Sequence, residues 1–397
     1  MFTDRISRIK PSATLEMTSK AAELKRANKP VYNMSVGEPD FSTPKHIQNA
    51  AIWAINNGHT KYTPGGGTLE LKEAISTKLY RDNNLSFDTK QIVVSCGGKH
   101  SLYNACQALF QKNDEVIIFK PYWVSFPDFV TVTGATPVFV NTNSSKQNEP
   151  DFDELIKKIN KNTKGIIINS PSNPSGGVWS DDAIMQLLDI VKNRSDIWIF
   201  SDECYEQLTY DIPFKSIATF APQLNNIITF QSCSKTYAMT GWRIGYLAGD
   251  INLVKAISKL QGQSTSCPNS IAQFAAMEAL SGDQKCVYEM KKIFHERRNL
   301  VLQELKKFPN VSCEVPNGAF YVFPNFKNYL NKKTQSGKLI KTSSDLSLYI
   351  LDQTGVVTVA GDSFGAPEHI RLSYATSNET ILKAVSLIGD TLKKIDF

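Results

Sequence analysis

The chain has 397 residues, of which 41% are hydrophobic and 21% charged, so the composition is that of a folded globular protein and excludes extended disorder. This length exceeds one ordinary hydrophobic core and favours two subdomains. The formal net charge is +6, but lysine pairs such as Lys157–Lys158 fall at helical spacing among apolar residues. That spacing favours solvated helix faces over a nucleic-acid-binding patch, so we expect no nucleic-acid partner.

The seven cysteines are scattered and form no CxxC pair, which disfavours a disulfide framework or a zinc site. We therefore expect no metal and a reducing compartment. The first residues are polar and lack the apolar core of a signal peptide, and no apolar run approaches membrane-spanning length. The expectation is a cytoplasmic protein without a membrane segment.

The first predicted elements are a helix over residues 12–27 and a helix over 45–57, separated by the turn-rich segment 33–44. Short apolar, β-branched runs then alternate with helical patterns. The strands are expected at 92–95, 115–119, 136–140, 165–168, 197–200, 227–230 and 244–248, and helices at 68–80, 99–111, 151–160 and 181–193. This alternation predicts a mostly parallel α/β sheet covered on both faces, with a break in the alternation between the last two runs.

A long, charged amphipathic helix is expected over residues 283–307. Strand-like pieces follow at 319–323, 356–359 and 369–373, with helices at 343–354 and 377–393. These elements predict a second, smaller α+β domain, which the N-terminal segment joins because chain ends often meet. We predict a large domain over 45–290 and a small domain made of 1–44 together with 291–397.

The segment 231–246, QSCSKTYAMTGWRIGY, follows an apolar strand and combines small residues with hydroxyls and two cations. Ser232 and Ser234 can donate hydroxyl hydrogen bonds to a phosphate, and Arg243 supplies a fork of charged donors. Lys235 lies beside them and could attach a cofactor covalently. A turn with a surface lysine would explain Ser-x-Ser-Lys alone, but the Gly-Trp-Arg-Ile-Gly-Tyr tail favours a cofactor site.

This segment resembles the lysine motif of the class I aminotransferases, which belong to the fold-type I superfamily of enzymes that use pyridoxal 5'-phosphate (PLP). The resemblance runs from about Lys10 to Thr376 and is nearest to the bacterial Iβ branch of aspartate aminotransferases, some of which also use prephenate. The shared motifs, in chain order, are KPSAT at 10–14, GEPDF at 37–41, TKYTP at 60–64, GGK at 97–99, PYWVS at 121–125, NSPSNPSG at 169–176, SDECY at 201–205 and RLSYATS at 371–377. The resemblance implies a large domain with a mostly parallel seven-stranded sheet sandwiched by helices, and a smaller α+β domain.

The resemblance also implies catalytic roles. Lys235 would hold PLP and move a proton, and Asp202 would pair with the pyridine nitrogen. Tyr205 and Asn173 would reach the 3′ oxygen of the cofactor, and Trp123 would stack on its ring. Taken alone, a strand-end aspartate such as Asp202 is equally well explained as a helix cap, and Tyr205 or Trp123 as a core aromatic.

At the phosphate end, Gly97, Gly98 and Lys99 follow a strand and open a helix, where backbone N–H groups can approach an anion. By the resemblance they join Ser232, Ser234 and Arg243 there. Gly65–Gly67 lacks the Lys-Ser/Thr of a P-loop and is read as an ordinary loop. Tyr62 resembles the tyrosine that a neighbouring subunit contributes to the phosphate, which would make the protein a homodimer with shared active sites.

For the substrate, the resemblance implies that Arg371 grips the α-carboxylate and that Gly37, Trp123 and Asn173 contact the same molecule. An arginine at a strand end is explained about equally well by a surface salt bridge. A second carboxylate would need further cations or donors, for which the candidates are Lys10, Ser12, Thr14 and Lys99.

The expected reaction is the transfer of an amino group from L-aspartate to 2-oxoglutarate in a ping-pong cycle, with prephenate to arogenate as a second reaction. Two alternatives keep the cofactor, namely an aminotransferase for aromatic amino acids or kynurenine, and a C–S lyase or decarboxylase. A PLP-binding transcription regulator would need an added DNA-binding module, for which about ten residues before KPSAT leave no room.

Overall fold

The computed structural model describes residues 3–9 and 13–395, apart from the side chains of residues 13–18 and 20. Its centre is a seven-stranded sheet in the order β2-β10-β9-β8-β7-β3-β4. Only β10 runs antiparallel to its neighbours, so the predicted mostly parallel α/β sheet is confirmed. The strands are β2 (Ile92–Ser95), β3 (Glu115–Phe119), β4 (Thr136–Val140), β7 (Thr163–Asn169), β8 (Trp198–Asp202), β9 (Ile227–Ser232) and β10 (Gly245–Ala248).

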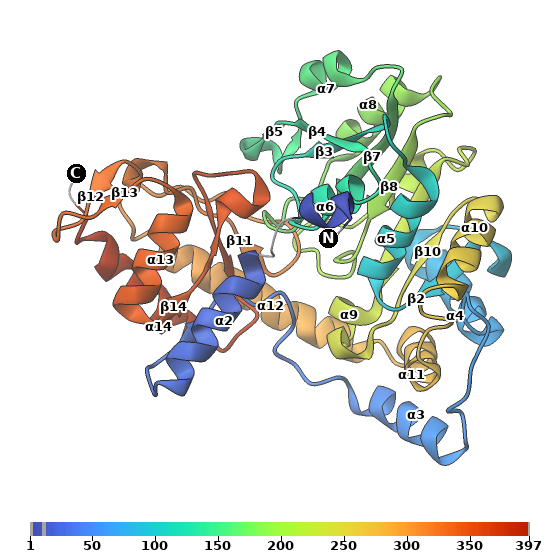
Figure 1. Ribbon diagram of the computed structural model, residues 1–397. Helices are drawn as coiled ribbons and strands as arrows, with labels where there is room; N and C mark the ends of the chain where they lie inside the picture. Colours follow the sequence, from blue (N-terminus) through green and yellow to red (C-terminus); the bar gives the residue numbers. More distant parts are fainter. Residues whose placement is uncertain (1–2, 10–12, 396–397) are drawn as a thin grey trace.

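Alternate side chains of these strands enter two separate cores, because successive residues of a strand point to opposite faces. Ile117 of β3 joins one core and Ile118 joins the other. The first face is covered by α3 (Lys45–Asn56), α4 (Leu69–Asn83), α7 (Phe152–Lys158), α8 (Asp181–Val191) and α11 (Ser270–Ser281), with α3 outermost against α11 (Figure 1). The second face is covered by α5 (Gly98–Leu109), α6 (Phe126–Thr131) and α10 (Ile251–Gly262).

Several of these helices begin where a short polar side chain caps the free backbone N–H groups of the first turn. Thr68 accepts from Leu71 N at the start of α4, and Ser180 accepts from Ala183 N at the start of α8. Asp250 accepts from two backbone N–H groups at the start of α10. Local sequence therefore sets where these helices start, while burial of their apolar faces holds them on the sheet.

The C-terminal part of the chain forms a second body with its own apolar cluster (Figure 1). The long helix α12 (Lys285–Leu305) leads into it, and α13 (Ser343–Thr354) and α14 (Asn378–Leu392) pack there. Its three-stranded sheet is β11-β16-β15, formed by Tyr321–Val322, Ile370–Ser373 and Val359–Ala360. N-terminal β1 (Tyr32–Asn33) pairs with β14 (Val356–Val357), and α2 (Ala13–Arg26) contacts β14, so the N-terminal segment lies beside this body. The domain limits near residues 44 and 290 stay a prediction.

The remaining elements are short. They are α1 (Asp4–Ser7), α9 (Cys233–Thr236), β5 (Thr142–Asn143), β6 (Glu149–Pro150), β12 (Lys332–Lys333), β13 (Leu339–Ile340) and 3-10 turns at Thr89–Gln91, Ser144–Lys146, Ile217–Phe220, Thr240–Trp242, Lys327–Tyr329 and Gly361–Phe364. Helices α6, α10 and α11 were not among the predicted elements. Among the described residues, every helix is too short or too polar to cross a membrane.

The parallel strands end at one edge of the large sheet, where α/β folds bind their ligands. β7, β8 and β9 end there at Asn169, Asp202 and Ser232. Because β10 is antiparallel, its first residue, Gly245, lies at the same edge, opposite Ser95 and Ser232. The fold thereby brings the ends of β7, β8 and β9 and the start of β10 together at one edge of the sheet.

Candidate active site

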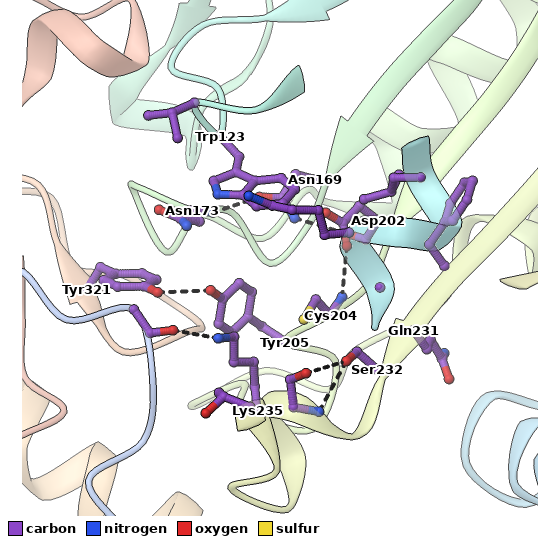
Figure 2. Close-up of a pocket in the computed structure, with 18 of the residues that line it drawn as sticks. Trp123, Asn169, Asn173, Asp202, Cys204, Tyr205, Gln231, Ser232, Lys235 and Tyr321 are labelled. Atoms are coloured by element: carbon purple, nitrogen blue, oxygen red, sulfur yellow. Dashed lines mark hydrogen bonds between the residues drawn. The ribbon is translucent and has the colours of Figure 1, made fainter. Parts of the chain in front are cut away.

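A cavity of about 240 Å³ opens at this edge, between the large sheet and the C-terminal body (Figure 2). Its walls come from strand ends of the sheet, from α5 and α9, and from β11 and β16. The residues predicted from the sequence that line it are Gly37, Gly98, Lys99, Trp123, Asn173, Asp202, Tyr205, Ser232, Ser234, Lys235, Arg243 and Arg371. The structure thus brings together residues that are separated by more than 300 positions in the sequence, from Gly37 to Arg371.

Lys235 lies in the short helix α9, directly after strand β9. Its Nζ donates a hydrogen bond of 2.5 Å to the carbonyl oxygen of Gly37. Burial lowers the pKa of the Lys235 amine, because a charged group is poorly solvated there. A larger neutral fraction makes the amine a better nucleophile and proton acceptor, which is what covalent attachment of an aldehyde requires.

Asp202 closes strand β8, in register with Asn169 of β7. Its Oδ1 accepts a hydrogen bond from Cys204 N at 3.3 Å, and Asn169 donates to its carbonyl oxygen at 3.1 Å. Burial, with the nearby Glu203 carboxylate, raises the pKa of Asp202 to about 7. A cationic group in the cavity would lower that pKa again and be held by the carboxylate.

The end of the cavity near helix α5 offers donors suited to an anion. Ser232 Oγ lies 2.8 Å from Ser234 Oγ, and Arg243 donates to the carbonyl oxygens of Thr240 and Cys96. Gly97 precedes the helix with φ +94°, and a Cβ there would lie 2.3 Å from Arg243 Nη2. The glycine therefore lets the guanidinium approach the helix N-terminus, where backbone N–H groups also attract negative charge.

Arg371 enters the cavity from strand β16 and is buried. Its Nη1 donates to Asn173 Oδ1 at 2.9 Å and its Nη2 to the carbonyl oxygen of Ser35 at 2.7 Å. Its Nε is buried and has no hydrogen-bond partner within the described structure. A buried guanidinium with spare donor capacity suits a carboxylate ligand.

Trp123 lies across the cavity from Lys235 (Figure 2). The Lys99 ammonium lies 4.8 Å from the centre of the Trp123 ring. Burial lowers the pKa of Lys99, and the charge of Arg243 lowers it further. The cavity therefore has two cationic regions, one at Lys99 and Arg243 and the other at Arg371.

Residues 29–388 match the family model described as aminotransferase class I and II. The chain belongs to the class I and II aminotransferases. Enzymes of this family generally use PLP, and the cavity fits that cofactor in chemistry. It offers hydroxyl, guanidinium and helix N-terminal donors for a phosphate, the Lys235 amine with its lowered pKa for an aldehyde and the Asp202 carboxylate for a ring nitrogen.

Individual aminotransferases resemble the chain over almost its whole length. A protein of Rhizobium leguminosarum bv. phaseoli named probable aspartate/prephenate aminotransferase is 45% identical over 96% of both chains. An aspartate aminotransferase of Geobacillus stearothermophilus is 42% identical over 97% of both. The crystal structure of the Rhizobium meliloti aspartate aminotransferase superposes with a TM-score of 0.96 at 40% identity, covering 100% of each chain. That of the Thermus thermophilus enzyme with maleate gives 0.92 at 35% identity, covering 98% of this chain and 99% of the other.

Several predicted site residues are not among the described residues that line this cavity. Lys10 and Ser12 lie outside the described residues, and the side chain of Thr14 is not described. Gly97 lies just behind the wall, against Arg243. Tyr62 lines a different hollow and is 90% exposed, so a single chain does not place it at the site. The functional roles of all these residues stay predictions.

Other cavity residues were not predicted as site residues, namely Leu102, Val124, Asn169, Cys204, Phe230, Gln231, Thr240 and Tyr321. Most of them adjoin a shared motif or lie inside one, so their position beside the motif residues is the signal that identifies them. Asn169, for instance, is the first residue of NSPSNPSG. Tyr321 is different, because it lies in the GAFYVF run of the C-terminal body, far in sequence from any residue it meets in the cavity.

Proposed function

We propose that the chain is a PLP-dependent aminotransferase that transfers the amino group of L-aspartate to 2-oxoglutarate, with prephenate to arogenate as a second reaction. The observation that carries the proposal is the position of Lys235. Its partly buried amine lies in a cavity that has anion-binding groups on the side of α5 and Arg371 on the side of β16. The names of the relatives support the choice of substrates.

When bound, PLP supplies an electron-accepting ring that stabilises negative charge at the α-carbon of an amino acid. Ser232, Ser234, Arg243 and the start of α5 would hold its phosphate, and Asp202 would keep its ring nitrogen protonated. Lys235 is then the group that takes the α-proton and returns it.

The charges of the cavity favour a substrate with two carboxylates. Arg371 is available to the α-carboxylate, and Lys99, beside Trp123, is a further cation on the cavity wall. Lys10, Ser12 and Thr14 are proposed to join Lys99 around the distal carboxylate. Aspartate and prephenate both carry two carboxylates, and maleate, present in the Thermus thermophilus structure, is also a dicarboxylate.

Initial rates with a panel of amino-group donors and acceptors test the reaction. Aspartate with 2-oxoglutarate, and glutamate with prephenate, should give far higher kcat/KM than alanine or kynurenine with 2-oxoglutarate. A preference for alanine or kynurenine would rule out the dicarboxylate proposal. Release of pyruvate from cysteine-type substrates, or of CO2, without amino transfer would instead favour a lyase or decarboxylase.

Substitution of the lysine tests the chemistry. Lys235→Ala should abolish the visible absorbance of the lysine-bound cofactor and nearly all turnover. Among the described residues, Lys99 is then the one lysine left on the cavity wall, and its proposed role is to bind an anion. The matched control is Lys112→Ala, which removes an exposed lysine of the large body and should leave both readouts unchanged. Substantial amino transfer by Lys235→Ala would refute the assigned role.

We further propose a homodimer in which Tyr62 completes the site of the partner subunit, in a reducing cytoplasm. Tyr62 is almost fully exposed in the single chain, and Ile52, Trp53 and Ile55 of α3 are about half exposed nearby in sequence. An exposed apolar group of this kind is typical of a protein–protein contact. The free state of all seven cysteines supports a reducing compartment.

A further inference from the structure

Tyr321 is buried at the meeting point of three parts of the cavity wall. It lies on β11 opposite Ser373 of β16, so it occupies the same face of the small sheet as Arg371, two residues before Ser373. A Cβ on Gly37 would lie 3.4 Å from the Tyr321 hydroxyl, which places that hydroxyl beside the backbone segment that accepts from Lys235. No sequence motif marked this residue.

The Tyr321 hydroxyl lies 2.9 Å from the Tyr205 hydroxyl (Figure 2). Each hydroxyl has one proton, so only one of the two can donate in this pair. Burial raises the pKa of both hydroxyls and raises that of Tyr205 well above its ordinary value, so Tyr321, whose ring also lies against the Arg371 guanidinium, is the better donor. When Tyr321 donates, the Tyr205 proton is free to point into the cavity. The hydrogen bond that the Tyr205 oxygen accepts then makes the Tyr205 hydroxyl a stronger donor.

The ring of Tyr321 has a separate contact with Arg371. The guanidinium carbon lies 4.5 Å from the centre of the Tyr321 ring and 5.2 Å from that of Phe364. Both rings attract the cation and restrict its plane, while Asn173 and Ser35 accept from its two Nη atoms. The hydroxyl and the ring of Tyr321 therefore serve two different partners.

We propose that Tyr321 is a positioning residue, whose hydroxyl directs the Tyr205 proton towards the cofactor and whose ring orients Arg371 towards the substrate carboxylate. The proposal rests on the proposed PLP-dependent function. It predicts that the two effects can be separated, because phenylalanine keeps the ring and loses the hydroxyl, whereas leucine loses both.

The first measurement is the pH at which the absorbance of the bound cofactor changes in the purified holoenzyme. Tyr321→Phe weakens Tyr205 as a donor to the cofactor oxygen, so the midpoint should rise by about half to one pH unit, the equivalent of about a three- to tenfold change. In a Tyr205→Phe background the same substitution should shift nothing further, because the hydroxyl it acts on is gone.

The second measurement is the dissociation constant of maleate, a dicarboxylate without an amino group, determined on the same holoenzymes. Tyr321→Phe should leave it within about twofold of the wild type, whereas Tyr321→Leu should raise it about three- to thirtyfold through loss of the cation–π contact. Tyr210→Phe is the matched control. It removes another buried tyrosine hydroxyl of the same apolar cluster, one that donates to the carbonyl oxygen of Ala319, and should change neither readout.

The outcomes separate the two proposals. A wild-type protein that fails to take up PLP would overturn the proposed function and this inference with it. Two results would overturn the inference alone, with a wild type that binds PLP. In the first, Tyr321→Phe has the same absorbance midpoint as the wild type. In the second, Tyr321→Phe shifts the midpoint as much in the Tyr205→Phe background as in the wild type. If Tyr321→Phe and Tyr210→Phe lower the unfolding temperature and shift the cofactor midpoint equally, Tyr321 is merely structural, which also overturns it.

Discussion

At the scale of single residues, the site depends on groups that burial has moved away from their ordinary chemistry. Lys235 is a lysine with a lowered pKa, and Asp202 is a carboxyl with a raised pKa. Arg371 is a buried cation whose hydrogen-bonding capacity is not fully used. Buried groups of this kind lower the stability of the folded protein in the absence of a ligand. A ligand with charges opposite to theirs offsets that cost, so its binding is favoured.

Arg371→Lys should raise KM for the amino acid about ten- to a hundredfold, because an ammonium cannot replace the planar fork that binds a carboxylate through two hydrogen bonds. Arg81→Lys changes a partly exposed arginine on α4 in the same way and should leave KM unchanged. Steady-state kinetics with aspartate check both variants. An unchanged KM in Arg371→Lys would contradict the assignment of Arg371 to the substrate carboxylate.

Glu203, the neighbour of Asp202, links pH to stability. Burial raises its pKa from 4.5 to about 7, although Ser216, Ser201 and Gln231 donate hydrogen bonds to it. Between these values the folded state binds more protons than the unfolded state, so the free energy of unfolding falls as pH rises from 4.5 through about 7. Glu203→Gln removes that contribution and should flatten the slope.

Chemical denaturation at a series of pH values across this window measures the slope. Glu289→Gln, which changes a carboxylate with 64% side-chain exposure, should retain the wild-type slope. If Glu203→Gln shows the same slope as the wild type, Glu203 is ionised in the folded protein throughout the range.

At the scale of elements, helix α4 is fastened to the sheet by a buried polar network. Lys78 forms an ion pair with Glu206 and donates to Asn83 Oδ1 at 2.8 Å and to Gln231 Oε1 at 2.7 Å. Gln231 in turn donates to Glu203 at 3.1 Å. The network therefore joins α4 to strand β9 and to the segment that follows β8, directly behind Asp202.

Lys78→Met should lower the free energy of unfolding by about 3–5 kcal/mol, because it leaves the buried Glu206 carboxylate without its cation. Adding Glu206→Gln should recover part of the loss, since the remaining charge is then removed as well. Denaturant midpoints of the single and double variants measure both effects. A Lys78→Met protein as stable as the wild type would show that the pair contributes nothing net.

At the scale of the whole molecule, the cavity exists only where two bodies meet. Asp202 ends strand β8 of the large sheet and Lys235 lies in α9 directly after β9, whereas Tyr321 and Arg371 come from the C-terminal body. Helix α12 spans the distance between the bodies (Figure 1). The exposed Tyr62 lies in a separate hollow, so the proposed complete site needs a second copy of the chain.

Hybrid dimers should reveal whether Tyr62 acts across the subunit boundary. One subunit carries Lys235→Ala and the other Tyr62→Phe, each with its own tag, and the hybrid is purified through both tags. If Tyr62 serves the partner's site, one site of each hybrid has both wild-type residues and should bind PLP with wild-type affinity. If Tyr62 serves its own site, neither site of the hybrid is intact and the wild-type affinity is absent.

The sequence predicted much of the large sheet, because the pattern that identifies each strand lies within a few consecutive residues. The runs at 115–119 and 136–140 are strands β3 and β4 with the same bounds, since an apolar, β-branched stretch between turn residues has few other stable conformations. The loop around Lys235 was equally readable, because its small residues, hydroxyls and cations are consecutive in the chain. The break in alternation before residue 244 is also confirmed, as β10 runs antiparallel.

Tertiary structure decided which distant groups meet and which charges are buried. Lys78 reads as an ordinary lysine on a helix, yet it is 2% exposed beside Glu206. Tyr205 and Tyr321 meet 116 positions apart, and Arg371 reaches Ser35 across 336. Such contacts arise from the pairing and packing of whole elements and leave no periodic trace in the sequence. The sequence by itself therefore determined most of the large sheet and the lysine loop, whereas the tertiary structure decided which charged groups are buried and that Tyr321 pairs with Tyr205.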